Sequence, residues 1–246
     1  MGWAATIGAL PGRAPVVSIM IYRDPASLAV ANALAADPFY AAITAPHRGD
    51  PSHQRLVLAD YFACSIEEGR RLGRVVDLAE PARGVAVWLL PQRADARAAD
   101  EKGTALRAVL GEAGIAIYGR IVAFMSRQTE GVVPAGAWYL SILAVDPSAQ
   151  GRGLGRRLLE PTLAEADTAG VRCYLETFTP RTVRFYERLG FVTRATVHEP
   201  TTGAQYAILV REARRRAPQP ETLDGRRLPS RFLGLARRAR CDAGGA

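Results

Sequence analysis

The hydrophobic pattern is clearest between residues 138 and 163. Residues Trp138 to Val145 form an apolar run of strand length, which predicts a buried strand, and Asp146-Pro147 ends it. A glycine-rich turn follows, and leucines then recur at helical spacing, at Leu154, Leu158, Leu159 and Leu163. The sequence therefore predicts a strand, a glycine loop and a helix N-terminus in succession.

The remaining apolar segments alternate between strand and helix patterns. We expect strands at Val16–Tyr22, Arg74–Leu78, Gly84–Leu90, Cys173–Phe178 and Ala204–Val210, and helices from Asp24-Pro25 to Ala36, from Pro51 onward, and over Asp95–Glu112 and Ile115–Gln128. Residues 137–197 should run strand, helix, strand, helix, strand. These elements indicate one domain over residues 15–211, with a loose leader at 1–14 and a basic tail at 212–246 for which disorder is expected.

The glycine loop has the chemistry of an anion site. The first N–H groups of a helix lack intrahelical partners and carry partial positive charge, so a phosphate or pyrophosphate is the expected ligand. Glycines let the backbone approach the ligand, and Arg152 and Arg156 add full charges. The loop has neither the P-loop ending Gly-Lys-Ser/Thr nor the Gly-x-Gly-x-x-Gly spacing of dinucleotide sites. The alternative is a plain tight turn between strand and helix.

Two motifs in this region resemble those of the GNAT acetyltransferase superfamily. Gln150-x-x-Gly153-x-Gly155 is similar to the family's acetyl-CoA pyrophosphate loop, and Phe185-Tyr186-Glu187-Arg188-Leu189-Gly190-Phe191 is similar to its second signature. The resemblance implies an α/β fold with a mixed sheet of six to seven strands flanked by helices, here with a two-helix insertion. It also implies an acyltransferase that uses acetyl-CoA as co-substrate and needs no metal.

Within the family, the similarity is densest to the puromycin N-acetyltransferases, a branch that inactivates an aminonucleoside antibiotic. It covers residues 138–191 closely and includes Leu175-Glu176-Thr177, but it is thin over the expected acceptor wall. This resemblance implies direct acetyl transfer to a primary amine of a small molecule, such as an aminonucleoside or another antibiotic-like compound, and a role in antibiotic resistance. Acetylation of a protein N-terminus or side chain is an alternative.

The resemblance also assigns roles to individual residues. Tyr186 would protonate the leaving thiolate, and Glu176 is the candidate base, although a structural carboxylate with a water relay is an equal alternative. Thr179 stands where many relatives have an asparagine that contacts the pantetheine arm. The donor would contact the backbone of Leu143, Ala144 and Val145, where an N–H at Leu143 or Val145 would hold the oxyanion. Its pyrophosphate would bind Gln150, Gly151, Arg152, Gly153, Leu154, Gly155 and Arg156.

The acceptor site should lie against the first two helices and their connection. His53, Tyr61 and Phe62 are candidate wall residues, although aromatic side chains at helical spacing more often belong to the core. The two inserted helices should pack over this pocket as a cap. Lys102 is the only lysine among the 32 basic residues of the chain; we attribute this bias to coding composition, and it says nothing about a site.

Charge and cysteine content exclude several other classes. Ten of the arginines and four acidic residues lie in residues 211–246, so +6 of the net charge of +8 belongs to this segment and the rest is nearly neutral. Nucleic acid is therefore not an expected partner, although a non-catalytic acyl-CoA-binding module with a nucleic-acid- or partner-binding tail is an alternative. No apolar run approaches the length of a membrane helix, and Cys64, Cys173 and Cys241 suggest neither disulfides nor a metal site. We expect a cytoplasmic monomer or homodimer.

Overall fold

A computed structural model of the chain describes residues 25–78 and 83–214. The expected leader, the strand at Val16–Tyr22 and the tail beyond residue 214 lie outside the described residues. The described elements, in chain order, are helices α1 (Pro25–Leu34), α2 (Pro38–Ile43) and α3 (Pro51–Leu72), strands β1 (Gly73–Asp77) and β2 (Gly84–Leu89), α4 (Ala96–Thr129), β3 (Trp138–Val145), α5 (Leu154–Ala169), β4 (Cys173–Thr177), α6 (Pro180–Arg188), β5 (Val192–Glu199) and β6 (Ala204–Arg211). Short 3₁₀ turns lie at Ala45–His47, Pro91–Arg93 and Pro147–Ala149.

The described strands form one mixed sheet in the order β1-β2-β3-β4-β6-β5. Only the β3–β4 pair is parallel, and the other neighbours are antiparallel. Helix α5 connects β3 to β4, since two parallel strands need a crossover connection, which is usually a helix. This architecture confirms the expected α/β fold with a six-stranded mixed sheet flanked by helices.

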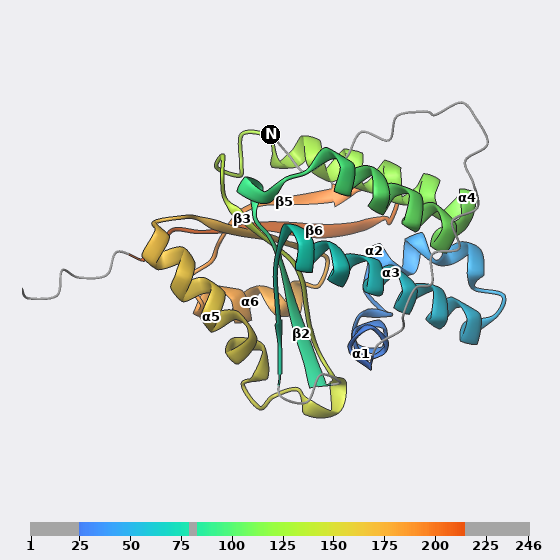
Figure 1. The fold of residues 1–246 in the computed structure, drawn as a ribbon, viewed down its shortest axis with the longest axis horizontal. Coiled ribbons are helices and arrows are strands. Elements are labelled where there is room, and N and C mark those ends of the chain that lie inside the picture. The colour runs from blue at the N-terminus through green and yellow to red at the C-terminus, as the bar shows by residue number, and fades with distance from the viewer. Residues whose placement is uncertain (1–24, 79–82, 215–246) are drawn as a thin grey trace, which may run out of the picture. The chain divides into compact units, whose positions relative to one another are not determined.

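Alternating side chains of the strands fill two separate apolar layers. Val85 and Val87 of β2 pack with α1, α3 and α4, whereas Ala86 and Trp88, which alternate with them along the strand, pack with α5 and α6. Figure 1 shows α5 and α6 on one side of the strands and α1 to α4 on the other. Because side chains of a strand point alternately to opposite faces, each strand supplies both layers.

Strand β3 contains a bulge in its middle. Leu140 lies opposite Trp88 and Ile142 lies opposite Val87, so Ser141 has no partner of its own in β2. An extra residue bends the strand and reverses which face its later side chains occupy. Leu140 accordingly packs with the α5–α6 layer, whereas Ile142 packs with the α1–α4 layer.

The same bulge marks the point where β3 and β4 separate. Their paired residues run only from Trp138 opposite Cys173 to Leu140 opposite Leu175. Within the described chain, residues 141–145 of β3 therefore have no strand partner on the β4 side, and β3 splays away from β4 beyond Leu140. The family resemblance implied that the donor contacts the backbone of this segment.

Helix α4 consists of two helical segments that meet at a kink at Gly111, whose φ of 67° lies in the left-handed region. The kink lies next to the expected boundary between the two inserted helices at Asp95–Glu112 and Ile115–Gln128. Helix α4 also contains an 18-residue window, with a mean hydropathy of 1.5, that is long and apolar enough to cross a membrane by length and composition. The expectation that no apolar run approaches the length of a membrane helix did not anticipate this window, because charged residues interrupt the helix and leave no long unbroken apolar run. In the described structure its leucine and isoleucine side chains pack with the layer that also contains α1 and α3.

The connection between α1 and α3 contains a short helix that the sequence analysis did not predict. Asp37 caps α2 by accepting a hydrogen bond from the backbone N–H of Phe39 at 3.0 Å, and Pro38 occupies the first helical position. The capping signal was present in the sequence, but the six residues of the helix are too few to show a helical period.

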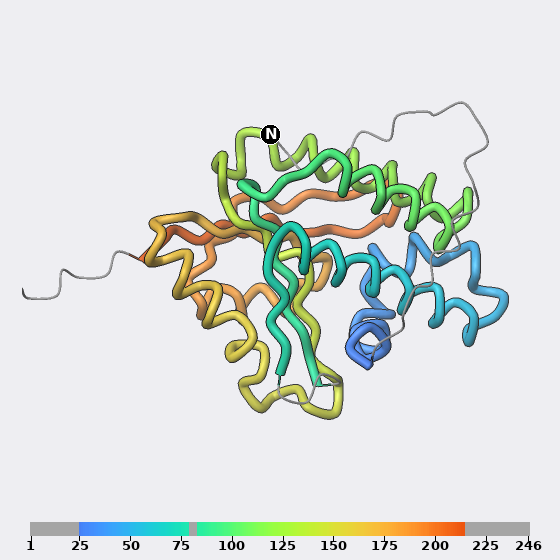
Figure 2. The backbone as a smooth tube through the Cα atoms, viewed as in Figure 1, coloured from blue at the N-terminus to red at the C-terminus, as the bar shows by residue number. Residues whose placement is uncertain are grey.

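The loop after β3 reaches the start of β2. The N–H of Asp146 donates a hydrogen bond to the carbonyl of Arg83 at 3.0 Å. In Figure 2 this loop lies at the bottom of the view, beside the end of the β1–β2 hairpin.

Candidate active site

A cavity of about 230 Å³ occupies the place where β3 and β4 separate. Its lining comes from α1 to α4, from the facing ends of β3 and β4, and from Thr182 and Tyr186 of α6. Since α6 packs on the opposite face of the sheet from α1 to α4, the cavity reaches through the gap between the two strands. The gap opens a route between the two faces of an otherwise paired sheet.

Tyr186 lies at this junction. Its side chain is 8% exposed, packs edge-on against Phe185 and Phe191, and lines the cavity. Its hydroxyl makes no hydrogen bond with any other residue in the described part of the chain. Burial, with a contribution from the nearby Asp37, raises the pKa of the Tyr186 phenol above its usual value. The phenol therefore stays protonated at neutral pH and is able to donate a proton.

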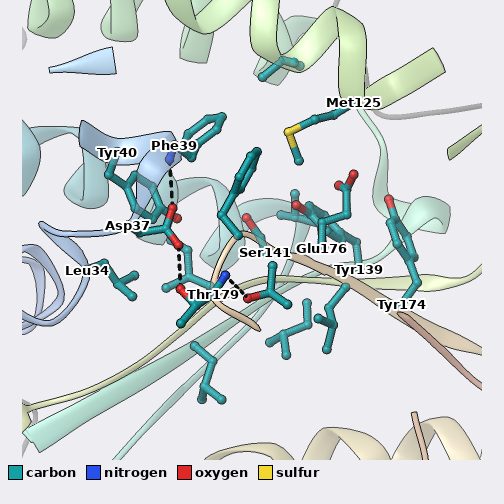
Figure 3. Close-up of a pocket in the computed structure, with 18 of the residues that line it drawn as sticks. Leu34, Asp37, Phe39, Tyr40, Met125, Tyr139, Ser141, Tyr174, Glu176 and Thr179 are labelled. Atoms are coloured by element: carbon teal, nitrogen blue, oxygen red, sulfur yellow. Dashed lines mark hydrogen bonds between the residues drawn. The ribbon is translucent and has the colours of Figure 1, made fainter. Parts of the chain in front are cut away.

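Of the described residues, Glu176 is one of three carboxylates that line the cavity, together with Asp37 and Glu68. It extends from the last part of β4, close to Tyr139 and Tyr174, whose rings stack at 4.7 Å (Figure 3). Burial raises the pKa of Glu176 to about 8, although a hydrogen bond from Tyr139 lowers it. Its Oε1 atom is buried and has no hydrogen-bond partner. A carboxylate with a pKa near the working pH and an unused acceptor atom is suited to take a proton.

Thr179 and Asp37 form a second polar group beside Tyr186. The Thr179 hydroxyl donates to Oδ2 of Asp37 at 3.1 Å, which joins the start of α6 to the start of α2 (Figure 3). Burial raises the pKa of Asp37, against the lowering effect of its hydrogen bonds from Phe39 and Thr179. The Thr179 hydroxyl is thus engaged by a carboxylate, and Asp37 is a wall residue that the sequence analysis missed.

The glycine loop leaves its N–H groups unused. Gly151 and Gly153 have φ values of 78° and 76°, in the left-handed region where a side chain is disfavoured, and a side chain on either would meet open space. No N–H group of residues 151–153 donates to another described residue. Gly153 is the N-cap of α5, so these donors join those of the first helical turn. The loop therefore has the geometry of an anion site.

The expected side-chain contributors of this loop are partly engaged elsewhere. Gln150 donates through Nε2 to the carbonyl of Val145 at 3.1 Å, and Arg156 pairs with Glu160 at 2.6 Å. Both are exposed, as is Arg152, and only Arg152 makes no hydrogen bond or ion pair within the described chain. The N–H groups are thus the pre-formed part of the site, with the charged side chains around them.

Contacts at the start of α5 connect the loop to the cavity. A Cβ atom on Gly155 would lie 3.2 Å from the ring of Phe185, the neighbour of Tyr186, and 3.8 Å from the side chain of Leu143. Leu143 itself lines the cavity. The helix start, the splayed end of β3 and the Tyr186 helix are therefore in direct contact, as a ligand that spans all three would require.

The helical wall of the cavity is aromatic. Phe39, Tyr40, Tyr61, Tyr118 and Phe178 line it. The ring centroid of Phe39 lies between 5.2 Å and 6.5 Å from the centroids of the other four rings. Burial raises the pKa of Tyr61 well above its usual value. Such a wall suits an apolar or aromatic body, or a cation placed against ring faces.

The candidate acceptor residues have different positions. Tyr61 lies on the cavity wall, Phe62 lies in the apolar layer and is fully buried, and His53 is exposed beside His47. Helix α4 contributes Tyr118, Val122, Met125, Ser126 and Thr129 to the lining, as a cap would.

The cavity wall also contains a buried ion pair. Nζ of Lys102 on α4 lies 2.5 Å from Oε2 of Glu68 on α3, and the two side chains are 18% and 11% exposed. The sequence analysis did not anticipate this pair, because pairing across 34 residues is decided by how α3 and α4 pack. Among the described residues, no three His, Cys, Asp or Glu side chains come together to hold a metal ion.

Comparisons with known proteins agree with this architecture. A family model described as the acetyltransferase (GNAT) domain matches residues 107–193. The chain is 41% identical over 73 residues to serotonin N-acetyltransferase 2, chloroplastic, of Oryza sativa subsp. japonica, which corresponds to 30% of this chain and 35% of that protein. The chain thus spans about a third of the length of this curated relative.

Solved structures extend the similarity to about three quarters of the chain. A structure from Corynebacterium glutamicum, described as histone acetyltransferase HPA2 and related acetyltransferase, aligns with a TM-score of 0.53 and 25% identity over 77% of this chain and 91% of that chain. Arylalkylamine N-acetyltransferase 2 from Aedes aegypti aligns with a TM-score of 0.50 and 15% identity over 78% and 95% of the two chains, which indicates a shared fold alone. The family model, the two sequence signatures and the splayed strands coincide in one part of the chain, and residues 107–193 are therefore similar to a GNAT acetyltransferase domain.

Proposed function

We propose that the protein is an acetyl-CoA-dependent N-acetyltransferase that acts on a primary amine of a small molecule by direct transfer in a ternary complex. The observation that carries this proposal is the cavity through the β3–β4 gap, which Glu176 and Tyr186 both line. It joins a site for the donor, at the glycine loop and splayed strand, to an aromatic site for the acceptor. The curated relative named as a serotonin N-acetyltransferase supports the reaction class.

The residues present fit acetyl-CoA. Free N–H donors at residues 151–153 and the first turn of α5 suit its diphosphate, and the unpaired edge of β3 at residues 141–145 suits its amide-containing arm. When bound, acetyl-CoA supplies an activated acetyl group as a thioester. Thr179 contributes less to holding the arm than an asparagine would, because its hydroxyl already donates to Asp37.

Two groups of this chain move protons in the proposed reaction. Glu176 accepts a proton from the acceptor ammonium or amine, since its pKa of about 8 lets it ionise near neutral pH. Tyr186 gives its phenolic proton to the sulfur that leaves, because its raised pKa keeps it protonated until then. A backbone N–H of Leu143 or Val145, on the unpaired edge of β3, stabilises the negative oxygen that forms in between.

The volume of the cavity favours a small acceptor molecule. Sites for drug-sized ligands typically have volumes of about 300–1,000 Å³, whereas this cavity measures about 230 Å³. A compact amine is therefore the preferred acceptor. An aminonucleoside or related antibiotic is the second candidate, which the dense resemblance over residues 138–191 favours, and protein acetylation is disfavoured because α4 covers the cavity.

Thiol release from acetyl-CoA with a panel of amines, including puromycin, tests the function. Tyr186→Phe should lower kcat by about 10²–10⁴-fold and leave acetyl-CoA affinity unchanged. Tyr206→Phe is the matched control, since it removes a buried hydroxyl that has no hydrogen-bond partner and does not line the cavity. Acetyl-CoA binding without turnover of any amine would instead support the non-catalytic binding module.

A further inference from the structure

The cavity has two chemically different ends. At one end lie Leu143, Tyr186, Thr179 and Asp37, close to the proposed donor site. The Glu68–Lys102 ion pair, which joins α3 to α4, lines the other end. The acceptor amine must react at the first end.

The contacts of the residues one helical turn from Glu68 and Lys102 show where the ion pair lies along the sheet. Leu72 follows Glu68 by four residues on α3, and Ala98 precedes Lys102 by four residues on α4, so each pair of residues shares a helix face. Leu72 and Ala98 pack together with Leu89 and Tyr139. The ion pair therefore lies near the Tyr139 end of β3.

This end is far from the reaction site on a molecular scale. Tyr139 and Leu143 are four residues apart in β3, which corresponds to roughly 13 Å along an extended strand and somewhat less across the bulge at Ser141. An acceptor whose amine lies near Leu143 and Tyr186 therefore extends toward Glu68 and Lys102. The aromatic wall formed by Phe39, Tyr61 and Tyr118 lies along this course.

The ion pair retains hydrogen-bonding capacity. A lysine ammonium has three donors and a carboxylate accepts about four hydrogen bonds, yet the one bond between Lys102 and Glu68 is the only hydrogen bond of either side chain within the described chain. Buried groups of this kind favour a partner. A cation would compete with Lys102 for Glu68, and an anion would compete with Glu68 for Lys102. A neutral hydroxyl bonds to both, since it donates to the carboxylate and accepts from the ammonium.

We propose that Glu68 and Lys102 recognise a hydroxyl group at the far end of the acceptor, so that the preferred substrates are compact amines with an aromatic body and a terminal hydroxyl. The inference rests on the proposed acetyltransferase function. A site built to bond a substrate hydroxyl discriminates strongly against the analogue that lacks it, because its own polar groups are then left unpaired. Glu68 and Lys102 thereby determine specificity without taking part in the chemistry.

Tyramine and phenethylamine test the proposal, because they differ only by the hydroxyl. The wild-type protein should use tyramine with at least roughly tenfold higher kcat/KM. In Glu68→Leu/Lys102→Met this preference should fall to about onefold. The paired replacement avoids leaving one buried charge without its partner.

A second ion pair between the same helices provides the control. Arg71 and Glu101 also join α3 to α4, at 2.6 Å, but are 43% and 44% exposed and do not line the cavity. Arg71→Met/Glu101→Leu should keep the wild-type preference. 4-Methoxyphenethylamine, whose oxygen accepts but does not donate, should be a poor substrate of the wild-type protein, a result that needs no variant to fold.

Each outcome decides the proposal. Equal kcat/KM for tyramine and phenethylamine in the wild type, or a preference that survives in Glu68→Leu/Lys102→Met, overturns it and leaves the acetyltransferase function intact. Turnover of other amines but of neither probe overturns it as well. Absence of thiol release with every amine, despite acetyl-CoA binding, overturns the proposed function and the inference with it.

Discussion

Replacing Glu176 by glutamine should stabilise the protein and reduce its activity. Burial raises the pKa of Glu176 from 4.5 to about 8, so the folded state holds a proton that the unfolded state releases between these values. The stability of the wild type therefore falls as the pH rises from 4.5 to about 8. A glutamine at this position has no charge to desolvate, and its amide retains the shape of the side chain.

The size of the effect follows from the two pKa values. With about 1.4 kcal/mol for each pH unit between them, ionisation should cost the wild type about 1.4 kcal/mol at pH 5.5 and about 4.6 kcal/mol at pH 8.5. The advantage of Glu176→Gln in free energy of unfolding should thus grow by about 3 kcal/mol over this range. Urea unfolding at the two pH values measures it. Glu130→Gln, at an exposed carboxylate after α4, is the control and should show no such growth.

The same variant tests the role of the carboxylate in catalysis. If Glu176 takes the proton, kcat/KM of the wild type should rise with pH up to about 8, and the variant should lose about 10²–10⁴-fold in rate together with this dependence. A stability difference that is the same at both pH values would refute the reasoning about burial. A variant with full activity would leave the water relay as the route for the proton.

Three further substitutions, and one control, test individual contacts of the structure. Gly153→Ala places a side chain at a φ of 76° without a steric clash, so it should cost about 1–2 kcal/mol of stability and weaken acetyl-CoA binding. Gly103→Ala inside α4 is the control and should gain up to about 1 kcal/mol. Chemical denaturation measures the stability of the two variants, and binding titration measures their affinity for acetyl-CoA. Asp167→Asn leaves the 3% exposed Arg211 guanidinium without its bidentate partner and should cost about 3 kcal/mol in urea unfolding. Burial alone would raise the pKa of Asp167, but hydrogen bonds from Arg211 and Arg214 hold this pKa below 3.8. The wild type should therefore lose the stabilisation from this ion pair only as the pH falls below 3.8. In acid unfolding, the stabilities of wild type and variant should converge in that pH range. Asp37→Ala removes the cap of α2 and the partner of Thr179, so it should cost about 1 kcal/mol and change the KM for acetyl-CoA, while equal KM values would show that this contact does not affect the donor site.

The sequence alone was sufficient for features that depend on neighbouring residues. The apolar run at Trp138–Val145 and the leucine spacing after Gly153 predicted β3 and α5, because side-chain periodicity follows directly from strand and helix geometry. The loop glycines and the motif around Tyr186 indicated the family in the same way. These signals lie within short windows, in which local geometry decides the structure.

The features that define the acceptor site depend on the tertiary structure. The bulge at Ser141 is a register shift between β2 and β3, and strand pairing leaves no signature in either strand alone. Asp37 meets Thr179 across 142 residues of sequence, and Lys102 meets Glu68 across 34. Periodicity predicts which face of a helix is buried but not which residue of a distant element lies opposite, since that depends on how the elements pack together. The residues of the proposed donor site could therefore be identified from the sequence, whereas the walls of the cavity were decided by the fold.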